Sequence, residues 1–190
     1  MAAPKPNPTL YFGYGSNLWI DQMNRRCPEN NLVGIGSIQG WKWIINGRGY
    51  ANIIPSLGDV VYGLVYEISE TDEASLDISE GVPRAYVKEI MSVDFIPRRD
   101  AHSDHPQLVN THQPRKIDGL VYVDFKRVTE SKPKEEYIYR INQGIVDGEK
   151  EGIPSDYFEK YFRPFIPAIN VDEKPDVLDP FAPELLRTET

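Results

Sequence analysis

A glycine-rich turn after an apolar strand is the first segment whose residues suit chemistry. Residues 11–17 read Tyr-Phe-Gly-Tyr-Gly-Ser-Asn, and a short helix is expected from Leu18. Consecutive backbone N–H groups at the start of a helix can hold an anion. The turn lacks the lysine of a Walker loop and the third glycine of a dinucleotide fingerprint. It is therefore an anion cradle or a tight turn capped by Ser16 or Asn17, and the residues alone leave both interpretations open.

Glu80, in the segment LDISEGVP, is the second candidate. It ends a predicted helix over Glu70–Glu80, for which Ser69 and Asp72 are the start signal and a glycine is the stop. The helix macrodipole and partial burial would both raise the pKa of this carboxyl, which suits proton transfer near neutral pH. The alternative is a solvated glutamate on the outer face of the helix, and the spacing permits either.

The other reactive side chains carry weaker signals. Cys27 is the only cysteine, so the chain has neither an internal disulfide nor a CxxC motif. Arginines precede it, but no histidine lies near it in the sequence. His102, His105 and His112 all lie in a polar insertion, Arg98–Arg115, between two predicted strands. Its proline and aspartate content favours a mobile, solvated loop, and we expect no metal site there.

Strand signals dominate the first two thirds of the chain. Asn46–Gly49 predicts a hairpin turn, because Asn and Gly tolerate positive φ. Strict strand–helix alternation is absent, which predicts an α+β fold: a compact mixed sheet or small β-barrel with a few flanking helices. The strands are expected at Leu10–Tyr14, Trp41–Ile45, Tyr50–Ile54, Val60–Ile68, Tyr86–Ile96 and Gly119–Phe125, and two further helices at about Lys134–Glu149 and Pro154–Phe162.

Length and charge limit the kind of protein. The 190 residues fit one domain, which we place at 9–168 with the insertion at about 98–115. Residues 1–8 are expected to be a flexible tail, and 169–190 an acidic tail containing proline. A net charge of −8 without a basic cluster argues against a nucleic-acid partner. No apolar run reaches about 20 residues and no secretory signal is present, so we expect a cytoplasmic protein without a membrane partner.

Four segments together resemble the γ-glutamylcyclotransferase family. They are YFGYGSN, ANIIPSLGDVVYGLVYEI, LDISEGVP and PKEEY, and the similarity extends over about Leu10–Ile166. The resemblance implies a compact mixed α/β barrel without a cofactor. It also implies an enzyme of glutathione metabolism that converts a γ-glutamyl amino acid into 5-oxoproline and a free amino acid. The insertion at 98–115 departs from the short connection usual in the family and is expected to reshape the leaving-group side of the pocket.

The resemblance also assigns roles to individual residues. Glu80 matches the catalytic acid of the family, and Tyr137, in the PKEEY segment, matches a tyrosine that contacts substrate. Tyr86 and Tyr122 fall where pocket tyrosines are expected, although the segment after Glu80 is about one residue shorter than in the family. The cradle that would hold the glutamyl α-carboxylate consists of Tyr11, Phe12, Gly13, Tyr14, Gly15, Ser16 and Asn17.

This reaction also fits the residues independently. The α-amine of the substrate attacks its own γ-carbonyl, so the protein needs no nucleophile, and one carboxylate with a raised pKa can remove and return the proton. Backbone N–H groups of Gly13–Ser16 are candidate donors to the oxyanion. Two alternatives stay open: a related cyclotransferase for γ-glutamylamines, glutathione or a glutathione conjugate of secondary metabolism, and a non-catalytic module that binds a γ-glutamyl or carboxylate ligand. The expected partner is a small γ-glutamyl molecule, and a homodimer is left open.

Overall fold

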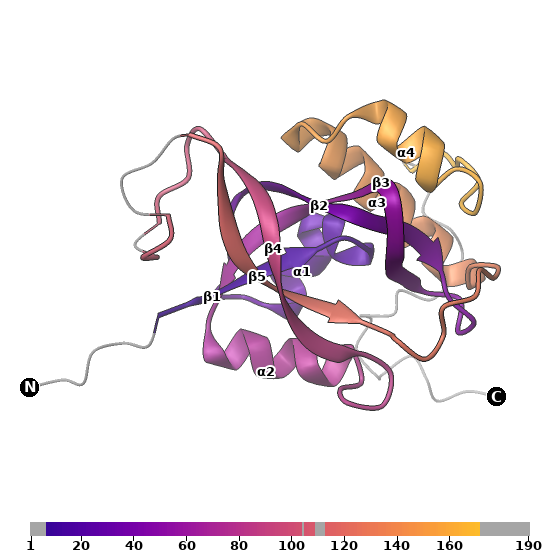
Figure 1. The fold of residues 1–190 in the computed structure, drawn as a ribbon, viewed down its shortest axis with the longest axis horizontal. Coiled ribbons are helices and arrows are strands. Elements are labelled where there is room, and N and C mark those ends of the chain that lie inside the picture. The colour runs from indigo at the N-terminus through magenta and orange to yellow at the C-terminus, as the bar shows by residue number, and fades with distance from the viewer. Residues whose placement is uncertain (1–6, 104, 109–112, 172–190) are drawn as a thin grey trace, which may run out of the picture.

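A closed barrel of five strands forms the centre of the protein (Figure 1). The computed structural model describes residues 7–103, 105–108 and 113–171. Neighbouring strands pair antiparallel except β1 and β5, which are parallel, so the sheet is mixed and the expected α+β barrel is confirmed. The strand order around the barrel is β1 (Thr9–Gly13), β3 (Ala51–Ile68), β2 (Asn31–Ile45), β4 (Val87–Pro97) and β5 (Arg115–Val123).

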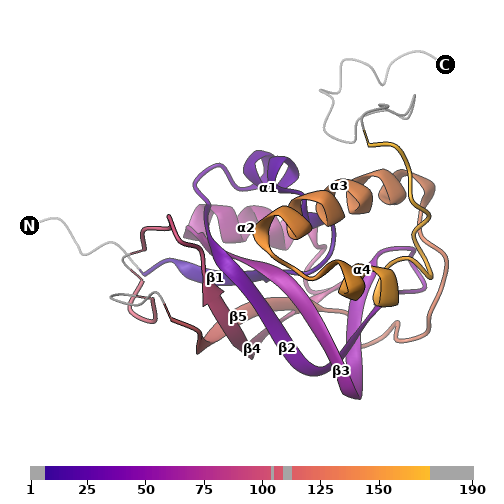
Figure 2. The ribbon, with the colours of Figure 1, turned by 90° about the horizontal axis from the view of Figure 1, so that it is seen from above.

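The helices gather on one side of the barrel (Figure 2). A single 3₁₀ turn, η1, follows β1 and packs against α3. None of the described helices combines the length and apolar character needed to cross a membrane. In chain order the helical elements are η1 (Ser16–Leu18), α1 (Ile20–Arg26), α2 (Glu70–Ser79), α3 (Glu135–Glu151) and α4 (Ser155–Tyr161).

Strands β2 and β3 are longer than the sequence predicts. Strand β2 begins at Asn31, ten residues before the expected start, and β3 joins two expected strands into one that contains Pro55 and Gly58. A register shift between Gln39 and Trp41 accommodates the proline, which pairs opposite Trp41. The start of β2 is rich in glycine and therefore lacks the β-branched run that marks a strand. These glycines let the strands pack closely inside the barrel.

The described part of the insertion packs against the barrel. His105 is 7% exposed, so the expectation of a solvated loop is wrong for this residue. The backbone carbonyl of His102 accepts a hydrogen bond of 2.9 Å from the Asn31 side chain, and Ser103 hydrogen-bonds Glu67. His112 lies outside the described residues. Across those that are described, no three His, Cys, Asp or Glu side chains converge as metal ligands.

The core supports the turn that follows β1. The ring of Trp43 stacks on Phe162, just after α4, with centroids 3.9 Å apart. Its indole N–H donates a hydrogen bond of 3.1 Å to the carbonyl of Tyr14. A fully buried aromatic cluster therefore fixes the backbone at the point where the glycine-rich turn begins.

Candidate active site

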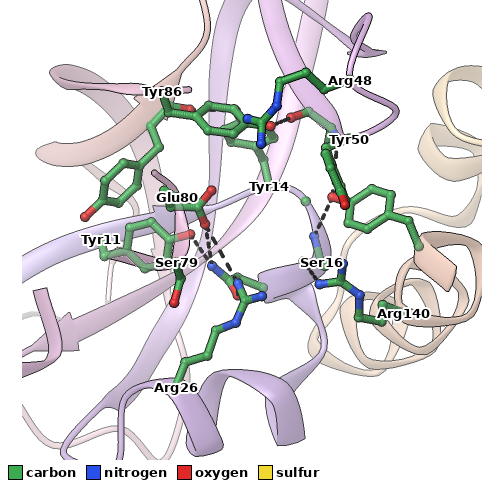
Figure 3. Close-up of a pocket in the computed structure, with 15 residues that line it drawn as sticks. Tyr11, Tyr14, Ser16, Arg26, Arg48, Tyr50, Ser79, Glu80, Tyr86 and Arg140 are labelled. Carbon is green, nitrogen blue, oxygen red and sulfur yellow. Dashed lines mark hydrogen bonds and ion pairs between the residues drawn. The ribbon is translucent and has the colours of Figure 1, made fainter. Parts of the chain in front are cut away.

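A pocket of about 200 Å³ opens beside the turn between β1 and η1 (Figure 3). This volume suits a small molecule. The pocket brings together most of the residues predicted from the sequence with several that were not. It is lined by Tyr11, Tyr14, Gly15, Ser16, Asn17, Arg26, Arg48, Tyr50, Ala51, Ser79, Glu80, Tyr86, Tyr122, Tyr137 and Arg140.

Two residues of the expected cradle do not line the pocket. The ring of Phe12 is 1% exposed and lies over Gly36 and Gly63, where an added Cβ atom would meet it at 3.2 and 2.7 Å. Phe12 therefore contributes to the barrel interior. Gly13 belongs to β1 and pairs with Leu64. Side chains alternate between the two faces of a strand, which explains why Tyr11 faces the pocket while Phe12 does not.

Glu80 lies at the end of α2, and its side chain points into the pocket (Figure 3). The hydroxyl of Ser69 accepts from the N–H of Asp72 at 3.1 Å, which confirms the expected helix start. At the other end, Gly81 has φ +64°, a conformation that ends helices and favours glycine. The chain thus turns directly after Glu80. The Glu80 side chain is 18% exposed, and its Oε1 atom lies 3.9 Å from Nη1 of Arg26.

Burial raises the pKa of the Glu80 carboxyl above its ordinary value. The guanidinium groups of Arg26, Arg140 and Arg48 oppose this effect, in that order, as does a hydrogen bond of 3.4 Å donated by Asn17. Desolvation disfavours the charged form, whereas nearby cations favour it. The arrangement keeps the proton affinity of Glu80 high while the arginines make ionisation attainable, as a proton-transfer group requires.

Asn17 links the turn to the carboxylate. Its amide nitrogen donates to the hydroxyl of Tyr11 at 2.8 Å and to Glu80. Its carbonyl oxygen accepts from Gln22 at 2.9 Å and from Arg26 at 3.1 Å. The N-cap of η1 is Gly15, and neither Ser16 nor Asn17 caps η1 through its side chain. The alternative of a turn capped by one of these two side chains is therefore wrong. The amide instead orients Glu80.

Gly15 allows Tyr137 to approach the turn. A Cβ atom at Gly15 would lie 3.0 Å from the Tyr137 hydroxyl and 3.0 Å from Ala51. That hydroxyl accepts the backbone N–H of Ser16 at 3.2 Å and of Ala51 at 3.3 Å. A hydroxyl has two acceptor lone pairs and one proton, so both lone pairs are occupied. No described residue accepts the proton, and burial raises the pKa of Tyr137, which keeps that proton in place.

Three other pocket tyrosines donate their hydroxyl protons within the protein. Tyr86 donates to the carbonyl of Ala51 at 2.7 Å, and Tyr122 donates to Asp77 at 2.7 Å. Tyr14 donates to the backbone carbonyl of Tyr122 at 2.6 Å. Their rings therefore shape the wall of the pocket, while their hydroxyl protons are unavailable to a ligand.

Sequence reasoning missed the pocket arginines and Tyr50. In the sequence, Arg26 stands out only as a neighbour of Cys27, and Arg48 only as part of a hairpin turn. Arg140 lies three residues after Tyr137, a spacing that places two side chains on one helix face, so this signal was available. Arg140 is 7% exposed and binds Glu136 through two hydrogen bonds of 3.0 and 3.1 Å.

These features define a small mixed barrel with one partly buried carboxylate, an adjoining turn and a tyrosine-lined pocket. Residues 11–135 match the family described as "Gamma-glutamyl cyclotransferase, AIG2-like". The chain belongs to this family.

Curated relatives and solved structures agree with the assignment. Bovine and human gamma-glutamylcyclotransferases are 32% and 30% identical over 83 and 92 residues, covering 38% and 43% of this chain. These matches span about half the length of the relatives, 44% and 49%. The mouse protein is 26% identical over 162 residues, which cover 80% of this chain and 76% of the mouse protein.

Among solved structures, a gamma-glutamyl cyclotransferase superimposes on this chain with a TM-score of 0.63 at 25% sequence identity. The superposition covers 80% of this chain and 85% of the cyclotransferase chain. A human protein described as uncharacterized gives a TM-score of 0.64 at 24% identity, with 82% and 86% covered. The second similarity concerns the fold alone.

Proposed function

We propose that this protein converts a γ-glutamyl amino acid into 5-oxoproline and a free amino acid, with Glu80 as general base and then general acid. The observation that carries the proposal is the Glu80 carboxylate, whose pKa is raised by burial and which faces the pocket beside the turn after β1. Membership of the γ-glutamyl cyclotransferase family supports this reaction class.

Proton transfer starts and ends the proposed reaction. The substrate α-ammonium has a pKa of about 8 or higher, so it must lose a proton before its nitrogen can attack. Glu80 accepts this proton, and the amine attacks the γ-carbonyl carbon to close a five-membered ring. As the bond to the departing nitrogen breaks, Glu80 returns the proton to that nitrogen. The ring nitrogen loses a second proton as the new amide forms. Glu80 also transfers this proton to the departing nitrogen, which leaves as an ammonium group.

Positioning of the substrate contributes the second part of the rate enhancement. The turn at Gly15–Asn17 is the proposed binding site for the glutamyl α-carboxylate, beside Glu80. When this carboxylate is held, the adjacent amine is positioned against the γ-carbonyl. The otherwise flexible glutamyl group of the substrate is then fixed in a conformation from which the amine can attack. The N–H of Ser16 already donates to Tyr137 at 3.2 Å, so the backbone donors of the turn proposed for the carboxylate are the N–H groups of Gly15 and Asn17.

Tyr137 is the proposed donor to the oxyanion of the tetrahedral intermediate. Two backbone N–H groups donate to its oxygen, and the Arg140 guanidinium lies 4.9 Å from its ring centroid. Donors that polarise a hydroxyl in this way strengthen the hydrogen bond it gives. A donor that is preorganised toward developing charge stabilises the transition state more than the ground state.

Turnover of a substrate panel tests the proposal. Purified protein is incubated with γ-glutamyl-alanine, a γ-glutamylamine and glutathione, and 5-oxoproline is measured by mass spectrometry. We expect release from γ-glutamyl-alanine. Release from glutathione or the amine alone would favour the related cyclotransferase. Tight binding of γ-glutamyl-alanine without release would contradict the proposal and favour a binding module.

Replacing Arg26 with Gln should shift the pH dependence of activity. Arg26 lowers the pKa of Glu80, so its loss raises this pKa further. Since the ionised carboxylate is the base, the acid limb of the kcat/KM profile should move to higher pH, because this profile reports the ionisation of the free enzyme. The measurement is kcat/KM for γ-glutamyl-alanine across the acid limb.

Arg25→Gln is the matched control for this variant. Arg25 is the preceding residue of α1, pairs with Asp21, has a 39% exposed side chain and does not line the pocket. Solvent screens its charge, so the acid limb should stay in place. An Arg26→Gln protein that is less active at every pH, with an unmoved acid limb, would show that Arg26 has only a structural role.

A further inference from the structure

Arg48 presents a buried guanidinium nitrogen that has no partner in the described part of the chain. Its Nη1 atom is inaccessible to solvent and makes no hydrogen bond, and no described carboxylate forms an ion pair with it. The group lies between two aromatic rings, 5.5 Å from the centroid of Tyr50 and 6.0 Å from that of Tyr86. A buried polar nitrogen without a partner is costly, and an anionic ligand would satisfy it.

The other two pocket arginines already have partners. Arg140 binds the Glu136 carboxylate through two hydrogen bonds, and Arg26 lies 3.1 Å from the Asn17 side-chain oxygen and 3.9 Å from Glu80. Arg48 is therefore the pocket arginine that forms no hydrogen bond or ion pair with a described acidic group, although its charge acts on Glu80 from a distance.

The backbone that carries Arg48 is held rigidly. The side-chain oxygen of Asn46 accepts the N–H of Arg48 at 3.0 Å, and its nitrogen donates to Asp124 at 3.1 Å. The carbonyl of Gly49 accepts the N–H of Lys134, at the start of α3, at 3.0 Å. The hairpin is thus attached to two other parts of the fold. A guanidinium on such a support binds a carboxylate with a smaller loss of conformational entropy.

Arg48 lies on the far side of the pocket from the arginines of α1 and α3. Figure 3 shows Arg48 beside Tyr86, whereas Arg26 and Arg140 lie across the pocket, next to Asn17 and Ser16. In the proposed reaction Glu80 must reach the α-amine, and the α-carboxylate is attached to the same carbon atom. That carboxylate must therefore lie near Glu80 and the turn. Arg48, on the other side of the pocket, is therefore left to contact the opposite end of the substrate, the departing group.

The geometry points to Arg48 as the residue that recognises a second carboxylate, that of the departing amino acid. This inference rests on the proposed function and deepens it. It assigns the substrate class as γ-glutamyl compounds whose leaving group carries a free carboxylate, over γ-glutamylamines that lack one. A planar guanidinium can bind such a carboxylate through two parallel hydrogen bonds.

A comparison of two substrates with two arginine variants tests this role. The substrates are γ-glutamyl-alanine and γ-glutamyl-ethylamide, which lacks the second carboxylate. The variants are Arg48→Met and, as a control, Arg84→Met, which removes one positive charge from an exposed residue that does not line the pocket. We expect the parent protein to prefer γ-glutamyl-alanine by about 10- to 100-fold in kcat/KM, the size of a hydrogen bond to a charged group. Arg48→Met should lose this preference, and Arg84→Met should keep it.

Three results would overturn the inference: no preference in the parent protein, an equal loss for both substrates in Arg48→Met, or the same loss in Arg84→Met. Dissociation constants for both compounds, measured by calorimetry on a Glu80→Gln background with and without Arg48→Met, keep the test independent of turnover. If γ-glutamyl-alanine binds more tightly than γ-glutamyl-ethylamide, and Arg48→Met removes this difference, the carboxylate subsite is supported. This holds even if the parent protein converts neither compound. Lack of conversion by the parent protein would contradict the proposed function but not the subsite. Absence of binding by both compounds would overturn both.

Discussion

Glu80→Gln should slow the release of 5-oxoproline by orders of magnitude while leaving the fold intact. Glutamine has nearly the same shape as glutamate, so the contacts with Asn17 and Arg26 can be kept, but it cannot take up and return a proton. General acid–base catalysis contributes about 10² to 10⁴ in rate, and kcat should fall by this factor. The measurement is 5-oxoproline release from γ-glutamyl-alanine at saturating substrate. A folded Glu80→Gln protein with full activity would contradict the proposed function.

Two comparisons separate a chemical effect from a structural one. Glu70→Gln makes the same change in the first turn of the same helix, at an exposed residue outside the pocket, and should keep full activity. The second comparison is the free energy of unfolding as a function of pH. The folded state binds the Glu80 proton more tightly than the unfolded state because the pKa is raised. The parent protein therefore loses stability as pH rises from the ordinary carboxyl pKa to the raised one. Glu80→Gln lacks this proton, so it should become more stable relative to the parent over that window.

Local signals in the sequence predicted much of the fold. The hairpin at Asn46–Gly49 and the start of α2 at Ser69 depend on turn and cap chemistry between neighbouring residues, and both form as expected. The buried face of α3, with Tyr137, Ile141 and Ile145, follows from helical spacing. Each of these features is determined within a few residues, which is why a single sequence contains it.

What the sequence left unpredicted depends on contacts between distant segments. Arg26, Arg48 and Arg140 come from α1, the β2–β3 hairpin and α3, and only the closed barrel brings them around Glu80. The burial of His105 likewise requires the insertion to pack on residues far away in the chain. Charged side chains at such positions have the same local signature as solvated ones, since composition and spacing do not record which face an element presents. The main cause of the raised Glu80 pKa is burial, a tertiary property that the end of a helix does not determine.

Tyr137→Phe should reduce kcat strongly while changing substrate binding much less. The substitution keeps the ring, which packs edge-to-face on Tyr50 with centroids 5.1 Å apart, and removes the hydroxyl. Loss of one donor to an oxyanion lowers kcat by about 10²- to 10³-fold, because this hydrogen bond is strongest in the transition state. The backbone N–H groups of Ser16 and Ala51 lose an acceptor in the variant, so unfolding must be measured in parallel with kcat and KM.

Tyr139→Phe is the matched control for this variant, because Tyr139 belongs to the same helix, accepts a hydrogen bond of 2.8 Å from Gln143 and does not line the pocket. It should retain the kcat of the parent protein. If the Tyr137 hydroxyl only holds the turn in shape, Tyr137→Phe should raise KM and lower the free energy of unfolding with little change in kcat. If it donates to the oxyanion, kcat falls and KM stays close to its original value, since an interaction made only in the transition state does not strengthen ground-state binding. The ratio of the two effects therefore decides between a supporting and a catalytic role for Tyr137.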